Sequence, residues 1–275
     1  MHATTNITSM RDGNQIPSIG FGVFLIPNSD VVAAVTTALD CGYRHLDTAS
    51  IYKNEVGVGE AVRASNVPRT DIFVTTKIWN DDQGAGKTKA ACLASLEKLG
   101  LDYVDLVLIH WPVPGRGLYV DTWRDLIDLR DNGQIKSIGV SNFNPDHLET
   151  IIQATGVVPV VNQIECHPWL QQTSLRKFHA SLGIITQSWS PLGRGKLLNE
   201  PIIKAIATKH DSTEAQIIIA WHLKIGNVVI PKSITPSRIL ENYQASKINL
   251  DSDDVAQILK LDAGIRVGPD PLQFK

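Results

Sequence analysis

The sequence contains few cysteines and little net charge. Its three cysteines, Cys41, Cys92 and Cys166, lie far apart and form no CxxC pair, which favours reduced thiols over a disulfide framework. With 26 Lys plus Arg against 28 Asp plus Glu, the net charge of -2 gives no overall basic surface. The composition therefore argues against nucleic acid and anionic membranes as partners.

Long apolar runs and a glycine fingerprint are also missing. No apolar run approaches the ~20 residues that span a bilayer, and the start, MHATTNITSMRDG, lacks the charged and apolar regions of a signal peptide. We therefore expect a soluble protein of the cytoplasm. GxGxxG is absent, because Gly57 and Gly59 are followed by Val62, and this argues against an open doubly wound sheet.

Two short motifs suggest chemistry that their spacing does not support. DDQGAGKT, at residues 81 to 88, ends like a Walker loop, but Asp81 stands at the required first glycine, so we reject triphosphate hydrolysis. Glu165, Cys166 and His167 are three potential metal ligands in a row, but neighbours on a strand point to opposite faces. We therefore expect no metal.

Strand and helix patterns alternate along the chain, and 43% hydrophobic residues predict a sizeable core. Strand patterns begin near Ser18, Tyr43, Phe73, Val104, Ser137, Val160, Gly183 and Gly226. Helical patterns cover residues 29–40, 55–65, 87–99, 119–131, 145–154, 171–181, 201–209 and 213–224. Eight such units predict a single α/β domain over residues 1–275, a (β/α)8 TIM barrel with extra helices; two small domains are the alternative.

Turn and cap signals mark the ends of the first elements. Asp12-Gly13 predicts a tight turn, so residues 1–17 are expected to form an N-terminal β-hairpin cap outside the barrel. Ser29-Asp30 is the candidate N-cap of the first helix, and Gly42 stands where that helix is expected to end.

Ionisable groups follow three consecutive apolar strands. GYRHLDTASIY, residues 42 to 52, ends a strand on Asp47 and carries Tyr52 in the next loop, and the two following strands place Lys77 and His110 near their ends. Taken alone, each residue has an ordinary structural explanation. Asp47 could cap a turn, Lys77 could extend into solvent, His110 could lie in the core, and Tyr52 could cover apolar surface. Because the carboxyl ends of barrel strands meet at one mouth, their recurrence predicts a site.

These residues belong to motifs that occur in order along nearly the whole chain. The motifs are GYRHLDTA with Tyr52, TTKIW, LIHWP, GVSNF, NQIECHP, and IPKS followed by Arg238. Together they resemble the aldo-keto reductase superfamily, and SWSPLGRGK and PKSITPSRILEN are most similar to the bacterial 2,5-diketo-D-gluconate reductase branch. The resemblance implies an NADPH-dependent reductase of small aldehydes and ketones.

The resemblance gives the four strand-end residues catalytic roles that suit their chemistry. Tyr52 would donate a proton to the substrate oxygen, and the Lys77 ammonium would lower the pKa of that phenol from about 10. Asp47 would keep Lys77 charged and aimed, and His110 would orient the substrate carbonyl. The alternatives are a Schiff-base aldolase with Lys77 as nucleophile, and a non-catalytic NADPH sensor or assembly subunit.

Residues after the later strands would hold NADPH. Ser141, Asn142 and Gln163 offer hydroxyl and amide groups for the nicotinamide carboxamide, and the ring of Trp189 suits stacking on nicotinamide, with core packing as the alternative. By the family pattern, further contacts would be made to the pyrophosphate by Ser190, Leu192 and Gly193, and to adenine by Glu241 and Asn242.

A helix predicted near the C-terminal end of the sequence carries an arginine in its first turn. Thr235-Pro236 predicts a helix whose first turn contains Arg238, with Lys232 shortly before it. A cation there opposes the helix dipole, so a bound anion would resolve the conflict. The resemblance implies the 2'-phosphate of NADP, held by Arg238, Lys232 and Ser233. In the alternative, Arg238 pairs with Glu241 or extends into water.

Aromatic residues gather at the expected mouth. Phe24, Trp79 and Trp111 would wall a substrate pocket beside His110, or else pack in the core. The loop VPGRGLY is short and about a dozen residues follow the last helical pattern, which predicts an open, shallow pocket for small dicarbonyls or keto acids such as methylglyoxal and 2,5-diketo-D-gluconate. Arg116 would meet a carboxylate or lie in solvent. We expect a monomer.

Overall fold

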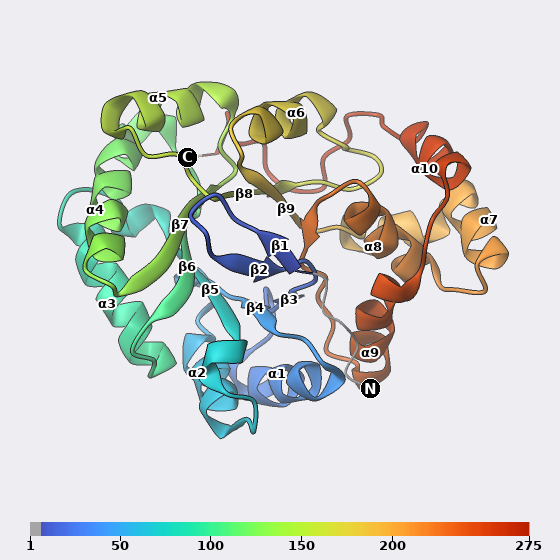
Figure 1. The fold of residues 1–275 in the computed structure, drawn as a ribbon, viewed down its shortest axis with the longest axis horizontal. Helices are drawn as coiled ribbons and strands as arrows, with labels where there is room; N and C mark the ends of the chain where they lie inside the picture. Colours follow the sequence, from blue (N-terminus) through green and yellow to red (C-terminus); the bar gives the residue numbers. More distant parts are fainter. Residues whose placement is uncertain (1–6, 275) are drawn as a thin grey trace.

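An N-terminal hairpin precedes the main sheet, as predicted. The computed structural model describes residues 7–274, so residues 1–6 of the expected cap lie outside the described residues. Strands β1 (Ile7–Ser9) and β2 (Gln15–Pro17) pair antiparallel, and Gly13 takes a φ of 88° in the turn between them, a conformation that glycine adopts without strain. The hairpin lies across the middle of the ring of strands (Figure 1).

The main sheet has eight parallel strands in chain order. They are β3 (Phe21–Gly22), β4 (His45–Asp47), β5 (Phe73–Ile78), β6 (Val104–Ile109), β7 (Ile135–Ser141), β8 (Val161–Glu165), β9 (Ile185–Trp189) and β10 (Val228–Val229). A parallel bridge between Ile19 and Val229 joins the first strand region to the last, which closes the barrel. The predicted (β/α)8 fold is confirmed. That residues 1–275 form one domain stays a prediction.

The first strand is shorter than predicted. Of the expected strand, only Phe21 and Gly22 form β3, Ile19 adds an isolated bridge to Val229, and Leu25 has turned away with a left-handed φ of 61°. The last strand begins at Val228 rather than near Gly226, since Gly226 has a φ of 81° in the turn after the preceding helix.

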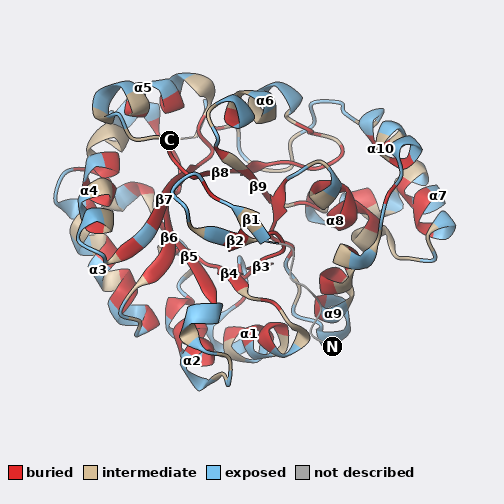
Figure 2. Cartoon of the chain, in the orientation of Figure 1, coloured by how far each residue is buried: buried red, intermediate tan, exposed pale blue. Residues whose placement is uncertain are grey.

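Ten α-helices surround the barrel within the described part of the chain, and their buried faces turn inward (Figures 1 and 2). They are α1 (Asn28–Cys41), α2 (Glu55–Ala64), α3 (Lys87–Leu99), α4 (Tyr119–Asp131), α5 (Pro145–Thr155), α6 (Thr173–Ser181), α7 (Pro201–Lys209), α8 (Glu214–Lys224), α9 (Pro236–Gln244) and α10 (Ser252–Leu259). Short 3-10 helices are η1 (Ser50–Tyr52), η2 (Arg69–Asp71), η3 (Asn80–Asp82), η4 (Pro114–Arg116), η5 (Gly193–Asn199) and η6 (Ala245–Lys247).

The predicted helix ranges agree with the structure to within two residues, but one cap prediction is wrong. Helix α1 starts at Asn28 after Pro27, and Ser29 and Asp30 lie in its first turn, where the Ser29 hydroxyl donates to the Asp30 carboxylate. The backbone therefore enters the helix one residue before the expected cap. Gly42 ends α1 in the left-handed conformation, as predicted.

The hairpin closes the amino end of the barrel with apolar side chains. Met10 and Ile16 form one buried cluster with Leu106, Leu108 and Val161 from the barrel interior. Burial of a side chain such as Ile16 contributes about 1.5–3 kcal/mol. The polar residues that carry chemistry are therefore confined to the opposite, carboxyl end of the strands.

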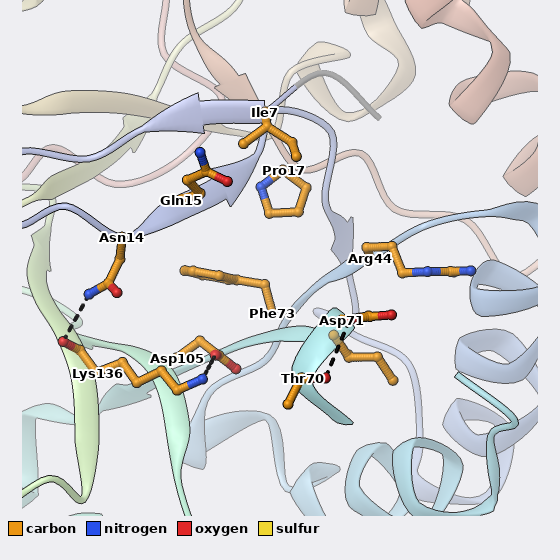
Figure 3. A pocket seen from close by; sticks show the side chains of 11 residues that line it. Ile7, Asn14, Gln15, Pro17, Arg44, Thr70, Asp71, Phe73, Asp105 and Lys136 are labelled. Atoms are coloured by element: carbon orange, nitrogen blue, oxygen red, sulfur yellow. Dashed lines mark hydrogen bonds and ion pairs between the residues drawn. The ribbon is translucent and has the colours of Figure 1, made fainter. Parts of the chain in front are cut away.

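A cavity of about 410 Å³ lies between the hairpin and the amino ends of β5 and β6 (Figure 3). Part of its charged lining is already paired, because Lys136 contacts the Asp105 carboxylate at 3.3 Å, and Asn14 donates to the Lys136 carbonyl at 3.4 Å. Phe73 supplies an apolar wall. The cavity therefore separates the cap from the barrel floor and is distant from the strand-end residues. No helix among residues 7–274 is long and apolar enough to cross a membrane.

Candidate active site

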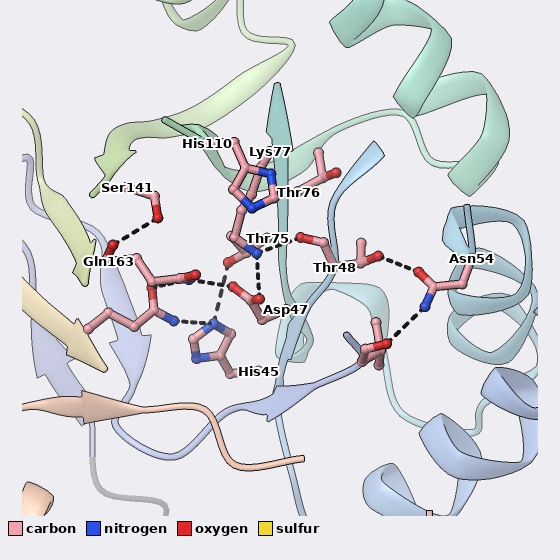
Figure 4. A network of polar contacts seen from close by, with 12 residues as sticks. His45, Asp47, Thr48, Asn54, Thr75, Thr76, Lys77, His110, Ser141 and Gln163 are labelled. Carbon is pink, nitrogen blue, oxygen red and sulfur yellow. Dashed lines mark hydrogen bonds and ion pairs between the residues drawn. The ribbon is translucent and has the colours of Figure 1, made fainter. Parts of the chain in front are cut away.

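Four predicted residues meet at the carboxyl end of the barrel. Asp47 is the last residue of β4, Lys77 lies in β5, His110 directly follows β6, and Tyr52 ends η1. The Lys77 Nζ donates to Asp47 Oδ1 at 2.5 Å and to the Thr48 carbonyl at 2.8 Å, and both side chains of the pair are buried (Figure 4). The expected ion pair between Asp47 and Lys77 is therefore present.

The ion pair is completed by an amide from the far side of the barrel. Gln163 in β8 donates from Nε2 to the second Asp47 oxygen at 2.7 Å (Figure 4). The same nitrogen lies 3.1 Å from Gln187 Oε1. A buried charge pair is tolerated only where further hydrogen bonds satisfy its oxygens and protons. Burial lowers the pKa of Lys77 from its usual value, against the opposing effect of Asp47. Lys77 thus donates two of its three N–H groups, to Asp47 and to the Thr48 carbonyl, as a member of a buried ion pair.

Tyr52 lies between the charged pair and the aromatic mouth. Its ring centroid is 5.1 Å from Lys77 Nζ, 5.8 Å from the His110 ring and 5.0 Å from the Phe24 ring. Burial, and then the Asp47 charge, raise the pKa of Tyr52 well above its ordinary 10.0. The expected net lowering of this pKa by Lys77 is therefore contradicted, because burial and the Asp47 charge set the direction of the shift.

His110 presents a neutral imidazole to the same space. Burial, and then the Lys77 charge, lower its pKa well below 6.5. Its Nδ1 is buried and has no hydrogen-bond partner within the described residues. The ring stands between Trp79, at a centroid distance of 5.1 Å, and Trp111, stacked at 6.5 Å. An uncharged ring held in this way suits a hydrogen bond to a substrate oxygen.

The residues expected at the carboxamide form one connected network. Ser141 Oγ donates to the Gln163 carbonyl at 2.8 Å, and Asn142 Nδ2 donates to the His110 carbonyl at 3.0 Å. Trp189 Nε1 donates to Asn142 Oδ1 at 2.8 Å, which fixes the indole ring beside the network. The structure therefore brings these side chains together, while the Gln163 amide nitrogen is engaged by Asp47.

The loop after β9, which is predicted to contact the pyrophosphate, contains residues with positive φ angles. Ser190 takes a φ of 49° and Gly193 a φ of 56°, and the Gly193 amide donates to the Ser190 carbonyl at 2.9 Å. Leu192 precedes η5 and is partly buried, packed against the hydrophobic cluster that contains Phe143 and against the one that contains Leu197. The pyrophosphate role of these three residues stays a prediction.

The start of α9 carries two exposed cations. Lys232 and Arg238 are exposed, and neither makes a salt bridge within residues 7–274. Thr235 stands at the N-cap position without a capping hydrogen bond, and Ser233 Oγ accepts from the Thr235 amide. Free helix amides beside two cations fit a phosphate dianion.

The alternative pairing of Arg238 with Glu241 is absent. Glu241 Oε1 accepts instead from the Thr213 hydroxyl of the α8 cap at 2.7 Å, so its carboxylate is held against α8. Asn242 is buried on the inner side of α9. Their adenine roles stay predictions, and the Glu241 carboxylate would have to leave Thr213 to serve one.

The substrate end contains two features that the sequence reasoning missed. Arg116 is exposed, as the solvent alternative expected, and the feature missed is its pairing within the loop region, where it donates to Asp81 at 3.1 Å and to the Asn80 carbonyl at 2.9 Å. Phe274 from the C-terminal tail stacks on Trp111 at 4.2 Å and narrows the mouth that was expected to be open. The lone aromatic in the tail segment PLQFK was the available signal.

The possible metal ligands at residues 165 to 167 serve another purpose. Glu165, the last residue of β8, accepts a hydrogen bond at 3.0 Å from His167, which lies two residues beyond the strand. Among the described residues, no group of three or more His, Cys, Asp or Glu side chains is arranged to hold a metal ion.

Comparison with known proteins agrees with the fold and the motifs. The model of the aldo/keto reductase family matches residues 18–263. An aldo-keto reductase of Mycolicibacterium smegmatis is 53% identical over 266 residues, which cover 97% of each chain. A methylglyoxal reductase DkgA of Salmonella typhimurium is 50% identical, with 99% of each chain covered.

A solved structure also shares the fold closely. A mutant of Gox0644 in complex with NADPH matches with a TM-score of 0.95 and 46% identity, over 99% of this chain and 100% of that one. With a family model that matches most of its length and relatives of about half-identical sequence, the chain belongs to the aldo/keto reductase family.

Proposed function

We propose that the protein reduces small aldehydes and ketones to alcohols with NADPH, and that Tyr52 is the general acid. The observation that carries this proposal is the buried Asp47–Lys77 ion pair at 2.5 Å with Tyr52 and His110 beside it. Bound NADPH supplies the hydride that adds to the carbonyl carbon. The protein must then supply a proton to the carbonyl oxygen, where negative charge develops.

The two groups at the mouth divide this work. Tyr52, whose raised pKa keeps its hydroxyl protonated, donates the proton to the oxygen. His110, which is neutral, orients that oxygen by a hydrogen bond. The phenolate left on Tyr52 is stabilised by the Lys77 ammonium, which Asp47 and Gln163 hold in place. The buried setting strengthens each of these electrostatic interactions.

Small dicarbonyls and keto acids are the proposed substrates, with methylglyoxal and 2,5-diketo-D-gluconate as representatives. Support comes from the aromatic walls of Trp79, Trp111 and Phe274, and from the relatives named methylglyoxal reductase. The preference for NADPH over NADH is assigned to Lys232 and Arg238. The monomeric state and the cytoplasmic location stay predictions.

The direct test is NADPH consumption against a panel of substrates. We expect purified protein to oxidise NADPH with methylglyoxal, with 2,5-diketo-D-gluconate or with simple aldehydes, and to form the corresponding alcohol. Oxidation with none of them would contradict the proposal and favour a sensor that binds NADPH without turnover. Trapping of Lys77 by borohydride plus substrate would instead indicate Schiff-base chemistry.

A further inference from the structure

A buried carboxylate holds the C-terminal tail. Glu165, the last residue of β8, accepts from the Val267 amide at 2.5 Å and from the Gly268 amide at 3.3 Å. Arg266 lies 3.7 Å from its second oxygen. Although burial raises the pKa of Glu165, hydrogen bonds from His167 and these amides lower it below its usual value. The catalytic chemistry described above makes no use of this carboxylate.

The clamped segment lies directly on the candidate nicotinamide-stacking ring. Glu165 and Trp189 are paired neighbours in the sheet, and a Cβ added at Gly268 would stand 2.4 Å from the Trp189 ring. Only glycine permits so close an approach of backbone to ring. The same ring donates to Asn142, which donates to the His110 carbonyl. The tail is thus joined to the candidate active site through consecutive contacts.

Beyond the clamp, the tail reaches the substrate end. Pro269 and Pro271 limit the freedom of the chain, and the amides of Gln273 and Phe274 donate to the Asp270 carbonyl in a turn. Phe274 then stacks on Trp111 at 4.2 Å and lies 6.2 Å from Trp79. A short, turn-bound segment therefore links the clamped backbone to the aromatic wall.

We propose that Glu165 is a positioning residue: by fixing the backbone at Val267 and Gly268 it holds Phe274 against Trp111, which narrows the substrate end and selects small carbonyl compounds. The proposal rests on the proposed function for its substrate readout, but the clamp itself is a structural claim. The narrowed substrate end selects by the size of the substituent on the carbonyl carbon, because the reacting oxygen is held by Tyr52 and His110.

The matched substrates are methylglyoxal and phenylglyoxal, which differ only in a methyl or phenyl group beside the same dicarbonyl. For Glu165→Ala we expect the ratio of kcat/KM, methylglyoxal over phenylglyoxal, to fall by about tenfold, the scale at which apolar pockets discriminate by size. The change should appear chiefly in KM. Glu165→Gln keeps an acceptor for the Val267 amide, so it should restore part of the ratio. Glu149→Gln on the exposed side of α5 is the surface control.

A double-mutant cycle separates positioning from a general loss of structure. Phe274→Ala should shift the substrate ratio in the same direction, and adding Glu165→Ala to Phe274→Ala should cause little further shift, because both act through one wall. Additive shifts, or equal losses of kcat/KM for both substrates in Glu165→Ala, would overturn the proposal.

Stepwise release of Lys275 and then Phe274 by carboxypeptidases B and A, followed by mass spectrometry, tests the clamp without an activity measurement. We expect faster release in Glu165→Ala than in the unmodified protein and in Glu149→Gln, with Glu165→Gln in between. Equal release rates would overturn the clamp. If the unmodified protein reduces neither dicarbonyl, the proposed function fails, and the release rates alone decide whether Glu165 holds the tail.

Discussion

The two charged regions of the candidate site are built in opposite ways. At the strand ends, Asp47 and Lys77 are buried and satisfied by one another and by Gln163. At the start of α9, Lys232 and Arg238 are exposed and have no acidic partner within the described residues. The first region is complete before any ligand binds, while the second has charges that a ligand can satisfy.

Because of this difference, substitutions in the first region should change folding stability, and substitutions in the second should change ligand binding. A buried pair that loses one partner leaves an uncompensated charge, so its disruption affects folding as well as activity. Exposed cations without partners contribute little to stability, and their removal affects the bound anion alone. Chemistry and cofactor choice should therefore respond to different substitutions.

The largest effect is expected at the proton donor. Tyr52→Phe removes the acid and keeps the ring that contacts Phe24 and His110, so turnover should fall about 10²- to 10⁴-fold. The dissociation constant for NADPH should change little, which fluorescence titration will measure. Turnover within a factor of three of the unmodified protein would remove Tyr52 from this role.

Loss of the ion pair should destabilise the fold. Asp47→Ala leaves Lys77 buried without its partner, and we expect a loss of about 3–5 kcal/mol in the free energy of unfolding. Denaturant unfolding checks this value, with Asp102→Ala on the exposed surface as the control, expected within about 0.5 kcal/mol. Equal effects of the two substitutions would show that the pair does not behave as a buried charge pair.

Removal of the exposed cations should change cofactor choice and leave stability unaltered. The double variant Lys232→Ala with Arg238→Ala should weaken NADPH about 10- to 100-fold, because charge-assisted hydrogen bonds contribute about 1.5–3 kcal/mol each. NADH binding should change much less, and Lys247→Ala serves as a control on an exposed lysine. Parallel losses for both cofactors would contradict the assignment of the 2'-phosphate.

The smallest effect is expected from pH. Because the pKa of Tyr52 lies well above 10.0 and that of His110 well below 6.5, neither residue changes charge between these values. The kcat of reduction should therefore vary less than about threefold from about pH 7 to about pH 9. Alcohol oxidation needs the deprotonated phenol and should rise with pH in this range. A decline of reduction centred near pH 8 would indicate that Lys77 lowers the pKa of Tyr52 in the loaded enzyme.

The sequence allowed prediction of the strand-end residues because strand periodicity and barrel topology place them. Asp47 and Lys77 each end or approach the end of an apolar strand, and parallel strands bring such ends together. The contact of Gln163 with Asp47 was not predictable in this way, because it crosses the barrel interior between β8 and β4. Local patterns indicate the strand face of a residue, but not its partner across a closed sheet.

The pKa of Tyr52 and the position of Phe274 could not be predicted from the sequence, because both depend on contacts between distant parts of the chain. The direction of the Tyr52 pKa follows from burial first and the Asp47 charge second, and neither can be read from local sequence patterns. The position of Phe274 follows from the Glu165 clamp, whose amide partners lie far along the chain. The family resemblance placed the motifs and assigned no role to this tail.

The most direct measurement compares the two regions in one experiment. Single-turnover reduction of methylglyoxal at saturating NADPH gives the chemical rate, and a titration of the same samples gives the dissociation constant for NADPH. We predict that Tyr52→Phe lowers the rate alone, and that Lys232→Ala with Arg238→Ala raises the dissociation constant alone. A Tyr52→Phe protein with an unchanged rate, or a double variant with unchanged NADPH affinity, would contradict this division of roles.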